Sequence, residues 1–401
     1  MLKIRQKEKV SENMENTDIR ALVQFSILDG LYWAFFAAYA GYITAHFLNC
    51  GLSSAALSLA LAVFMAFSFA GSFFWGSVCD RKKTNRKVFL GEFTAALIAG
   101  LLIYQLAYFN VMIAAFLYPL FGFLVSPLGS NLDAWMLRSF HHDGAVYGKA
   151  RSIGSAGYAV AMLICGQIIA RAGYKMLPLM TLVFAIPVLL LAGVIRETPY
   201  ENHLAAGEKA DMKQLFKVGP YILLLVILFL TGLAMAPINN LKIVLIQSTG
   251  GDVSILGIDQ FLGVMVQAAA IFFSGNLRTI KPKLRLFLMS VLVLATMFCT
   301  ALAWSPLLII AGTMLSNLSY GIMLPTQREI TEDYVPSALI TTAHSLADAM
   351  FGSFSGVIAL LYSGFVMDTF GAKSVAVLGG VIMIVPILIA LIALLKRNNN
   401  Q

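Results

Sequence analysis

Long apolar segments alternate with short polar links along almost the whole chain of 401 residues. A helix needs about 20 mostly apolar residues to cross the hydrocarbon core of a bilayer. Twelve segments meet this requirement. The pattern therefore predicts an all-α integral membrane protein with helices near residues 21–48, 53–79, 88–108, 110–137, 150–171, 175–195, 219–247, 254–277, 286–303, 306–327, 338–363 and 374–395.

The longest polar stretch lies between the sixth and seventh predicted helices and divides the chain into two halves. It runs from about Arg196 to Lys217. Each half then contains six helices, which predicts two six-helix bundles. The expected divisions are an N-terminal tail over 1–20, a first bundle over 21–195, a central loop over 196–218, a second bundle over 219–395 and a C-terminal tail over 396–401.

Composition and charge agree with this pattern. Hydrophobic residues make up 59% of the chain and charged residues only 12%, about half of the roughly 25% typical of soluble domains. A net charge of +8 could indicate nucleic acid, but the basic residues gather in the tail, the second-to-third link and the central loop. Lys and Arg accumulate on the cytoplasmic side of membranes. We therefore expect a multi-pass protein of the cell membrane, in contact with lipid, with both termini cytoplasmic and no nucleic-acid partner.

Motifs for catalysis or cofactor binding are absent from the sequence. It contains no phosphate-binding glycine loop, no His-Glu-x-x-His and no metal-spaced cluster, and its four cysteines are scattered through apolar segments. An enzyme is therefore not expected, and neither is a cofactor or a metal. Nothing in the sequence requires a second subunit, so we expect a monomer that uses concentration gradients as its energy source.

Two opposite charges flank the link between the fourth and fifth predicted helices. Asp133 precedes this link and Arg151 follows it. A charge near hydrocarbon costs at least about 2.5 to 3.5 kcal/mol on insertion scales, so paired charges on adjacent helices indicate an internal polar site. Alternatively, both residues are ordinary helix-end charges whose heads reach the interface.

The link between the second and third helices reads Gly-Ser-Val-Cys-Asp-Arg-Lys-Lys-Thr-Asn-Arg-Lys from Gly76. It resembles the Gly-x-x-x-Asp-Arg-x-Gly-x-Arg-Lys loop of the major facilitator superfamily, with Asp80, Arg81 and Arg86 at the charged positions. Lys83 stands where that family usually has its second glycine, and one residue is added before Arg86. The resemblance implies a secondary transporter with its substrate site between the two bundles.

This link is a candidate gate. Gly76 would allow a close helix approach, and Asp80 could accept hydrogen bonds at a neighbouring helix N-terminus, where the dipole favours a carboxylate. Such contacts with Asp80, Arg81 and Arg86 would hold one conformation and break in another. The alternative is that the basic residues only fix topology and contact anionic lipid headgroups.

Residues 133 to 158 are similar to the lactose permease and oligosaccharide–proton symporter branch of that superfamily. There an acidic residue precedes, by the same eighteen residues, the arginine of a Gly-Arg-x-Arg-x-x-Gly-x-x-Gly-aromatic segment. The resemblance implies that Asp133 and Arg151 hold sugar hydroxyls and that Tyr158 stacks on the sugar ring. Gly154 and Gly157 match too, although they also suit tight helix packing.

The seventh helix and the eighth add further candidates for the substrate site. Asn239, Asn240 and Lys242 make the seventh helix unusually polar after Pro237. Lys242 could pair with an acidic group, meet an anionic substrate or extend toward the outer interface. Gln267 aligns with an amide of the permease, which implies a sugar contact.

The proton-coupling residues of the permease branch are missing from the second half. Val264, Thr296, Ser316 and Ser319 stand at the positions of that branch's charged or titratable side chains. Other intramembrane acids are therefore candidates for coupling, because an ionisable residue in a membrane helix is a functional candidate by default.

Four residues could replace the missing proton machinery. His344 and Asp348 are four residues apart and would share one helical face, and Asp348 would lie about 15 Å into its span. They could share a proton or form a static hydrogen-bonded pair. Asp29 lies about 14 Å inward of Arg20 on the first helix, and Asp259 is a weaker candidate closer to the outer surface.

These observations together predict a secondary active transporter that moves a small polar solute by alternating access. The expected substrate is a sugar, an oligosaccharide or a nucleoside, carried with a proton. One alternative is an exporter of drugs or metabolites on the same fold, which many aromatic residues and 18 methionines could serve. A second alternative is a non-transporting receptor or assembly factor.

Overall fold

The computed structural model describes residues 2–140, 144–197, 212–273, 279–336 and 339–395. Every regular element in these ranges is a helix. Twelve helical segments are long and apolar enough to span a bilayer, which confirms the predicted number. The predicted C-terminal tail and residues 198–211 of the predicted central loop lie outside the described residues.

The first half contains six spanning helices joined by short links. The link before α6 contains a short 3₁₀ turn, η1 (Tyr174–Met176). The spanning helices are α1 (Leu2–Asn49), α2 (Ser54–Lys82), α3 (Arg86–Phe109), α4 (Val111–Ser139), α5 (Gly144–Ala172) and α6 (Leu177–Val194). The α1 helix already begins at Leu2, well before the apolar segment, so part of the predicted polar tail is helical.

The second half also contains six spans, two of which are interrupted. The predicted seventh span ends at Asn240 and is followed after Leu241 by a short separate helix. The eleventh contains a π-helical turn, η5 (Met350–Phe354). The elements are η2 (Met212–Lys217), α7 (Gly219–Asn240), α8 (Lys242–Gln247), α9 (Val253–Phe272), α10 (Pro282–Ala301), α11 (Pro306–Tyr334), α12 (Ile340–Ala349), η5, α13 (Ser355–Phe370) and α14 (Ser374–Leu395).

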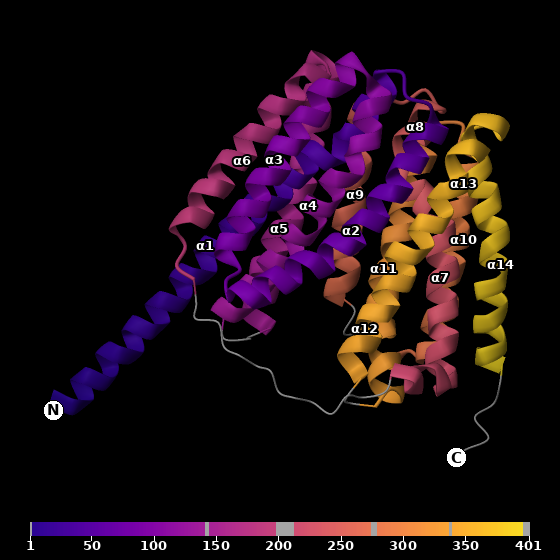
Figure 1. Cartoon of the computed structure of the whole chain (residues 1–401). Coiled ribbons are helices and arrows are strands. Elements are labelled where there is room, and N and C mark those ends of the chain that lie inside the picture. Colours follow the sequence, from indigo (N-terminus) through magenta and orange to yellow (C-terminus); the bar gives the residue numbers. More distant parts are fainter. Residues whose placement is uncertain (1, 141–143, 198–211, 274–278, 337–338, 396–401) are drawn as a thin grey trace.

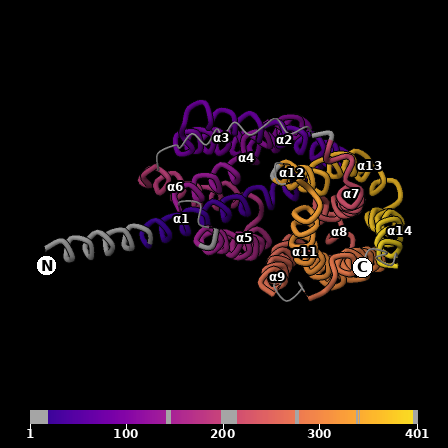
Figure 2. Tube along the Cα trace, turned by 90° about the horizontal axis from the view of Figure 1, so that it is seen from below, coloured from indigo at the N-terminus to yellow at the C-terminus, as the bar shows by residue number. Residues whose placement is uncertain are grey.

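The helices form two bundles that stand side by side. Figure 1 shows α1 to α6 on one side and α7 to α14 on the other, with α2 and α9 near the boundary. The main contacts between the bundles join α2 to α13 and α5 to α9, and both pairs are neighbours in the view of Figure 2. This arrangement confirms the predicted fold of two six-helix bundles.

Glycine allows α1 and α5 to approach closely within the first bundle. A Cβ atom on Gly157 would overlap the backbone of Gly30. Close approach through small residues is a common basis of helix packing in membranes, because backbones can then make extensive van der Waals contact. The same approach brings the side chains of Asp29 and Trp33 against α5.

Hydrogen bonds join the two bundles near one end of the molecule. The Ser58 hydroxyl donates to the carbonyl of Leu360 over 2.5 Å. The backbone N–H of Ala55, in the first turn of α2, donates to the Asp368 carboxylate over 2.8 Å. Asp368 therefore caps a helix of the opposite bundle, where the helix dipole favours a negative charge.

Candidate substrate cavity and ion clusters

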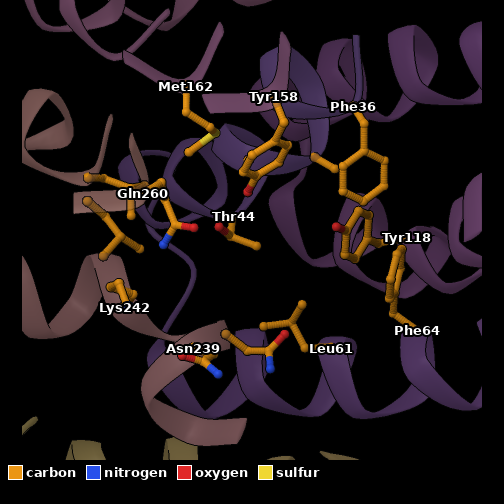
Figure 3. A pocket seen from close by; sticks show the side chains of 15 residues that line it. Phe36, Thr44, Leu61, Phe64, Tyr118, Tyr158, Met162, Asn239, Lys242 and Gln260 are labelled. Atoms are coloured by element: carbon orange, nitrogen blue, oxygen red, sulfur yellow. The ribbon is translucent and has the colours of Figure 1, made fainter. Parts of the chain in front are cut away.

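A cavity of about 220 Å³ lies between the two bundles (Figure 3). The first bundle contributes four rings to its wall, from α1, α2, α4 and α5. The second bundle contributes Lys242 and the amides of Asn239, Asn240 and Gln260. We call this space the aromatic cavity; its rings are Phe36, Phe64, Tyr118 and Tyr158.

A second cavity of about 250 Å³ adjoins the first on the side of the second bundle. Asn239, Lys242 and Gln260 line both cavities. We call this space the polar cavity; the polar side chains that line it in addition are Thr231, Gln267, Ser316, Asn317, Ser319 and Tyr320. Each cavity is smaller than the roughly 300 to 1,000 Å³ of typical small-molecule sites, and the two together fall within that range.

A buried ion pair stands at the junction of the cavities. The Lys242 ammonium lies 3.2 Å from the Asp259 carboxylate and donates a hydrogen bond of 2.7 Å to the Thr313 hydroxyl. Both charged side chains are almost wholly buried. Lys242 is the single charged residue among the described lining residues, and its charge is matched by that of Asp259.

The α9 helix that carries Asp259 has a well-formed N-terminus. Asp252 accepts hydrogen bonds from the backbone N–H groups of Ser254 and Ile255 and from the Ser254 hydroxyl. These bonds hold the pKa of Asp252 below its usual range, and the bond from the Ser254 side chain has the largest effect. The cap fixes the start of α9 and thereby the position of Asp259 two turns further on.

A second ion cluster lies inside the first bundle. The Arg151 guanidinium is 3.7 Å from the Asp29 carboxylate and 3.6 Å from that of Asp133, and it covers the Trp33 ring at 4.4 Å. Asp29 is completely buried, whereas Arg151 and Asp133 retain about a third of their exposure. Neither Asp29 oxygen has a hydrogen-bond partner among the described residues. Two carboxylates therefore share one cation.

The seven predicted substrate residues fall in the two cavities and in the ion cluster. Tyr158, Asn239, Asn240 and Lys242 line the aromatic cavity, and Gln267 lines the polar cavity. Asp133 and Arg151 come together as expected from their positions but are not among the residues that line either cavity. Arg151 precedes Tyr158 by seven residues on α5, which is about 10 Å along the helix axis.

Trp33 links the ion cluster to the cavity. Its ring contacts the Arg151 guanidinium on one side and lies 6.5 Å, centroid to centroid, from the Tyr158 ring. Gly154 makes room for this arrangement, because a Cβ atom there would overlap both the Asp29 carboxylate and the Trp33 ring. Gly154 thus positions the ion cluster, a role distinct from ligand contact.

The four predicted proton-coupling residues have different surroundings. Asp29 lies in the ion cluster and Asp259 in the buried pair with Lys242. His344 and Asp348 lie on α12 and face residues of α11. The His344 ring lies 3.8 Å from the Glu332 carboxylate, whereas Asp348 is half exposed and pairs with Arg328 over 3.0 Å. The Gln327 side-chain amide also donates to Asp348 over 2.7 Å.

The predicted gating link has a defined structure. Glu197 accepts hydrogen bonds from the Thr84 hydroxyl and from the backbone N–H groups of Asn85 and Arg86, and so holds the start of α3. The Arg86 side chain donates to the carbonyls of Ala192 (3.0 Å) and Gly193 at the end of α6. This network ties α3 to the end of α6.

The remaining predicted gate residues lie at the end of α2. Asp80 and Arg81 are exposed. A Cβ atom on Gly76 would meet no described atom within 4 Å, so the expected close helix approach at Gly76 is not seen among the described residues. Lys83 adopts a left-handed backbone with φ of 51°, the conformation that glycine adopts most readily, at the position where the sequence comparison expects a glycine.

Some residues of the two cavities, and one buried acid of the first bundle, are not apparent from the sequence patterns considered above. Phe36 and Phe64 could not be separated from lipid-facing aromatics, and Thr231 lies in an unbroken apolar run. Glu92 of α3 is completely buried, and neither of its oxygens has a hydrogen-bond partner among the described residues. An acidic residue inside an apolar window would have indicated Glu92.

Two six-helix bundles with a cavity between them are the architecture of many membrane transporters. The chain belongs to the MFS_1 like family, which it matches over residues 23–377. This result agrees with the superfamily resemblance of the second-to-third link, and it indicates a transporter and not an enzyme.

Individual proteins similar to this chain include transporters for different solutes. A maltose permease of Geobacillus stearothermophilus is 24% identical over 351 residues, which cover 86% of this chain and 87% of the permease. The crystal structure of the nucleoside transporter NupG has a TM-score of 0.80, with 13% identity over 94% of this chain and all of that one. A bacterial metal transporter has a TM-score of 0.72, with 14% identity over 94% of this chain and 99% of the other. The two structural likenesses show the shared fold.

Proposed function

We propose that the protein is a secondary active transporter of the cell membrane that moves a small neutral polar solute, a sugar, an oligosaccharide or a nucleoside, together with a proton. The observation that carries the proposal is the aromatic cavity at the boundary of the bundles, together with the polar cavity that adjoins it. Residues of both bundles line the aromatic cavity, so rocking of one bundle against the other would expose a bound solute to alternate sides.

The chemistry of the cavity walls supports a neutral polar solute. The side-chain amides of Asn239 and Gln267 make no hydrogen bond to the described residues, so their donors and acceptors are available to a ligand. Aromatic rings cover the apolar faces of sugar rings and nucleobases. The similarity to a maltose permease and to the fold of a nucleoside transporter supports the same classes of solute.

The ion cluster of the first bundle is the best candidate for the coupling proton. Asp29 is buried, without a hydrogen bond from the described residues, and competes with Asp133 for Arg151. A second ionised carboxylate next to one cation is costly away from water, so a proton on Asp29 would remove an uncompensated charge. Contact through Trp33 to Tyr158 would let solute binding and protonation influence each other.

We also propose that both termini are cytoplasmic, because the basic links lie on that side by the positive-inside rule. The hydrogen bonds of Ser58 and Asp368 between the bundles then lie at the outer end. The present conformation would therefore have its outer end closed. Membrane lipid would contact the exposed apolar residues, and the protein would act as a monomer.

Flux into vesicles tests the proposal. Purified protein is reconstituted, and uptake of labelled maltose, glucose and uridine is measured with an inward proton gradient, with no gradient and with the reverse gradient. We expect accumulation driven by the inward proton gradient. Asp29→Asn should abolish accumulation but retain exchange of solute between the two sides, because the cavity is unchanged.

Other outcomes would contradict the proposal in different ways. Accumulation driven by the opposite proton gradient would indicate an exporter. Accumulation that ignores both gradients would exclude proton coupling and leave a uniporter or a different coupling ion. Absence of flux for every solute, with the protein folded, would favour a receptor or an assembly factor.

A further inference from the structure

The two adjoining cavities differ in chemistry, and this difference bears on the shape of the solute. Four rings line the aromatic cavity together with Leu61, Met162 and Leu256, and the amides in its wall come from the second bundle. Eight of the thirteen described residues that line the polar cavity carry a hydroxyl or an amide group. A solute that fills both must therefore present a different surface to each.

Four aromatic rings of the first bundle lie close together in the wall of the aromatic cavity. The rings of Phe64 and Tyr118 are stacked, with centroids 4.6 Å apart and planes 17° apart, and Phe36 and Tyr158 also line the cavity (Figure 3). The Phe64, Phe36 and Tyr158 side chains are only partly buried, so their faces remain available to a ligand. Aromatic rings favour stacked or edge-on contact with another flat ring.

The polar cavity has hydrogen-bonding groups without intramolecular partners. The Thr231 hydroxyl is buried and has no hydrogen-bond partner among the described residues, although it lines the cavity. A buried polar group without a partner is costly, which indicates that a ligand or water completes it. The Gln267 side-chain amide also makes no hydrogen bond to the described residues. The Asn317 side-chain amide donates one hydrogen bond to the backbone carbonyl of Thr313, and its side-chain oxygen remains available to a ligand.

Asn239, Lys242 and Gln260 mark the junction between the cavities. The Lys242 ammonium has three donors, of which Asp259 and Thr313 occupy two. The third is left for an acceptor at the junction. An oxygen or nitrogen that joins two rings would suit this position.

We propose that the solute is a glycoside of two unlike rings, with its hydroxylated ring in the polar cavity and a flat aromatic ring in the aromatic cavity. This inference rests on the proposed transport of sugars or nucleosides and restricts it. Aryl glycosides and nucleosides share the required chemistry, a sugar linked to a flat unsaturated ring. A lone sugar would fill only half of the space, and the second ring of a disaccharide would cover the four aromatic rings less fully than a flat ring would.

Binding to the parent protein is measured first, in detergent, by thermal shift and calorimetry with glucose, maltose, p-nitrophenyl glucoside and uridine. We expect p-nitrophenyl glucoside or uridine to bind at least about tenfold more tightly than glucose, since stacking on aromatic side chains contributes at this level. Preference between these two identifies the flat ring as an aryl group or a nucleobase. Equal or tighter binding of glucose or maltose would overturn the proposal.

Variants of each cavity then test the assignment of the rings. Phe36→Leu should weaken binding of the flat-ring glycoside about tenfold without changing glucose binding. Thr231→Val and Gln267→Leu should weaken both ligands by a similar factor, because both place a sugar in the polar cavity. Phe116→Leu is the matched control, since Phe116 is 81% exposed on α4 and lies outside both cavities.

The two proposals fail in distinguishable ways. If Phe36→Leu weakens glucose and the flat-ring glycoside equally, the aromatic cavity holds a sugar and the inference fails while transport of sugars stands. If vesicles loaded with parent protein take up none of the four solutes and none binds, the proposed function fails as well.

Discussion

The two bundles carry ion clusters of opposite design. In the second bundle, one cation meets one carboxylate at 3.2 Å, and Thr313 accepts a further hydrogen bond from Lys242. In the first bundle, Arg151 stands 3.6 to 3.7 Å from two carboxylates. The Lys242 pair is compact and neutral, whereas the Arg151 cluster is looser and has one excess negative charge when both acids are ionised.

This difference indicates different roles. A buried pair with matched charges resists change, because separating it leaves an uncompensated charge in a medium of low polarity. A cluster with one acid too many can accept a proton without losing its ion pair. We therefore interpret the Lys242 pair as a fixed support of the cavity and the Arg151 cluster as the part that changes state.

The largest expected effect is on the fixed pair. Asp259→Asn should destabilise the protein by about 3 to 5 kcal/mol, because the buried Lys242 ammonium would lose its counter-charge. Thermal or denaturant unfolding in detergent measures the loss. Asp252→Asn, at the exposed cap of the same helix, is the control and should change stability by less than about 0.5 kcal/mol, since asparagine caps equally well. Similar losses for both variants would show that the pair has no special role.

The second prediction concerns the space that the loose cluster requires. Gly154→Ala should cost about 1 to 3 kcal/mol by overpacking, because the added methyl group would displace Asp29 and the Trp33 ring. Gly148→Ala lies on the same helix with no described atom within 4 Å of its Cβ and should stabilise by up to about 1 kcal/mol. Unfolding experiments on the two variants measure this difference in stability. The difference would disappear if the side chains of the ion cluster could rearrange freely.

The third prediction contrasts the acids of the two clusters directly. Asp29→Asn should change stability by about 1 kcal/mol or less, because Arg151 keeps Asp133 and the new amide has nearly the same shape. The difference from Asp259→Asn is the test, measured in the same unfolding assay. A loss of 3 kcal/mol or more at Asp29 would show that its ionised form is needed to hold Arg151.

The smallest effect is expected at the contact between the bundles. Asp368→Asn should weaken the charge–dipole contact with the start of α2 by about 0.3 to 1 kcal/mol. The fraction of molecules in which the two bundles are separated at the outer end should rise by a factor of about 2 to 5. Distances between spin labels on α2 and α13 report this shift, and Asp333→Asn, in the last turn of α11, is the control. An unchanged distance distribution would exclude the contact as a latch.

The sequence predicted the fold well because hydrophobic length alone defines a membrane helix. It also brought Asp133 and Arg151 together, because each lies within about two turns of the helix ends that the link between α4 and α5 joins. The sequence could not predict which acid pairs with Lys242, because the spacing along the chain did not distinguish among several acidic residues of the second half. His344 and Asp348 share a helix as expected, but α11 supplies closer partners for each, which only the packing of helices reveals.

The π-helical turn Met350–Phe354 bears on how the eleventh span tolerates changes in length. A π turn contains one residue more than the α-helix needs, so the segment already holds an inserted residue. Deletion of Gly352, whose Cβ would meet no described atom within 4 Å, would allow a regular α-helix to form with both ends nearly in place. Deletion elsewhere in this span would instead rotate one end by about 100° and turn lipid-facing side chains inward. The turn is therefore the site where this span can most readily lose a residue.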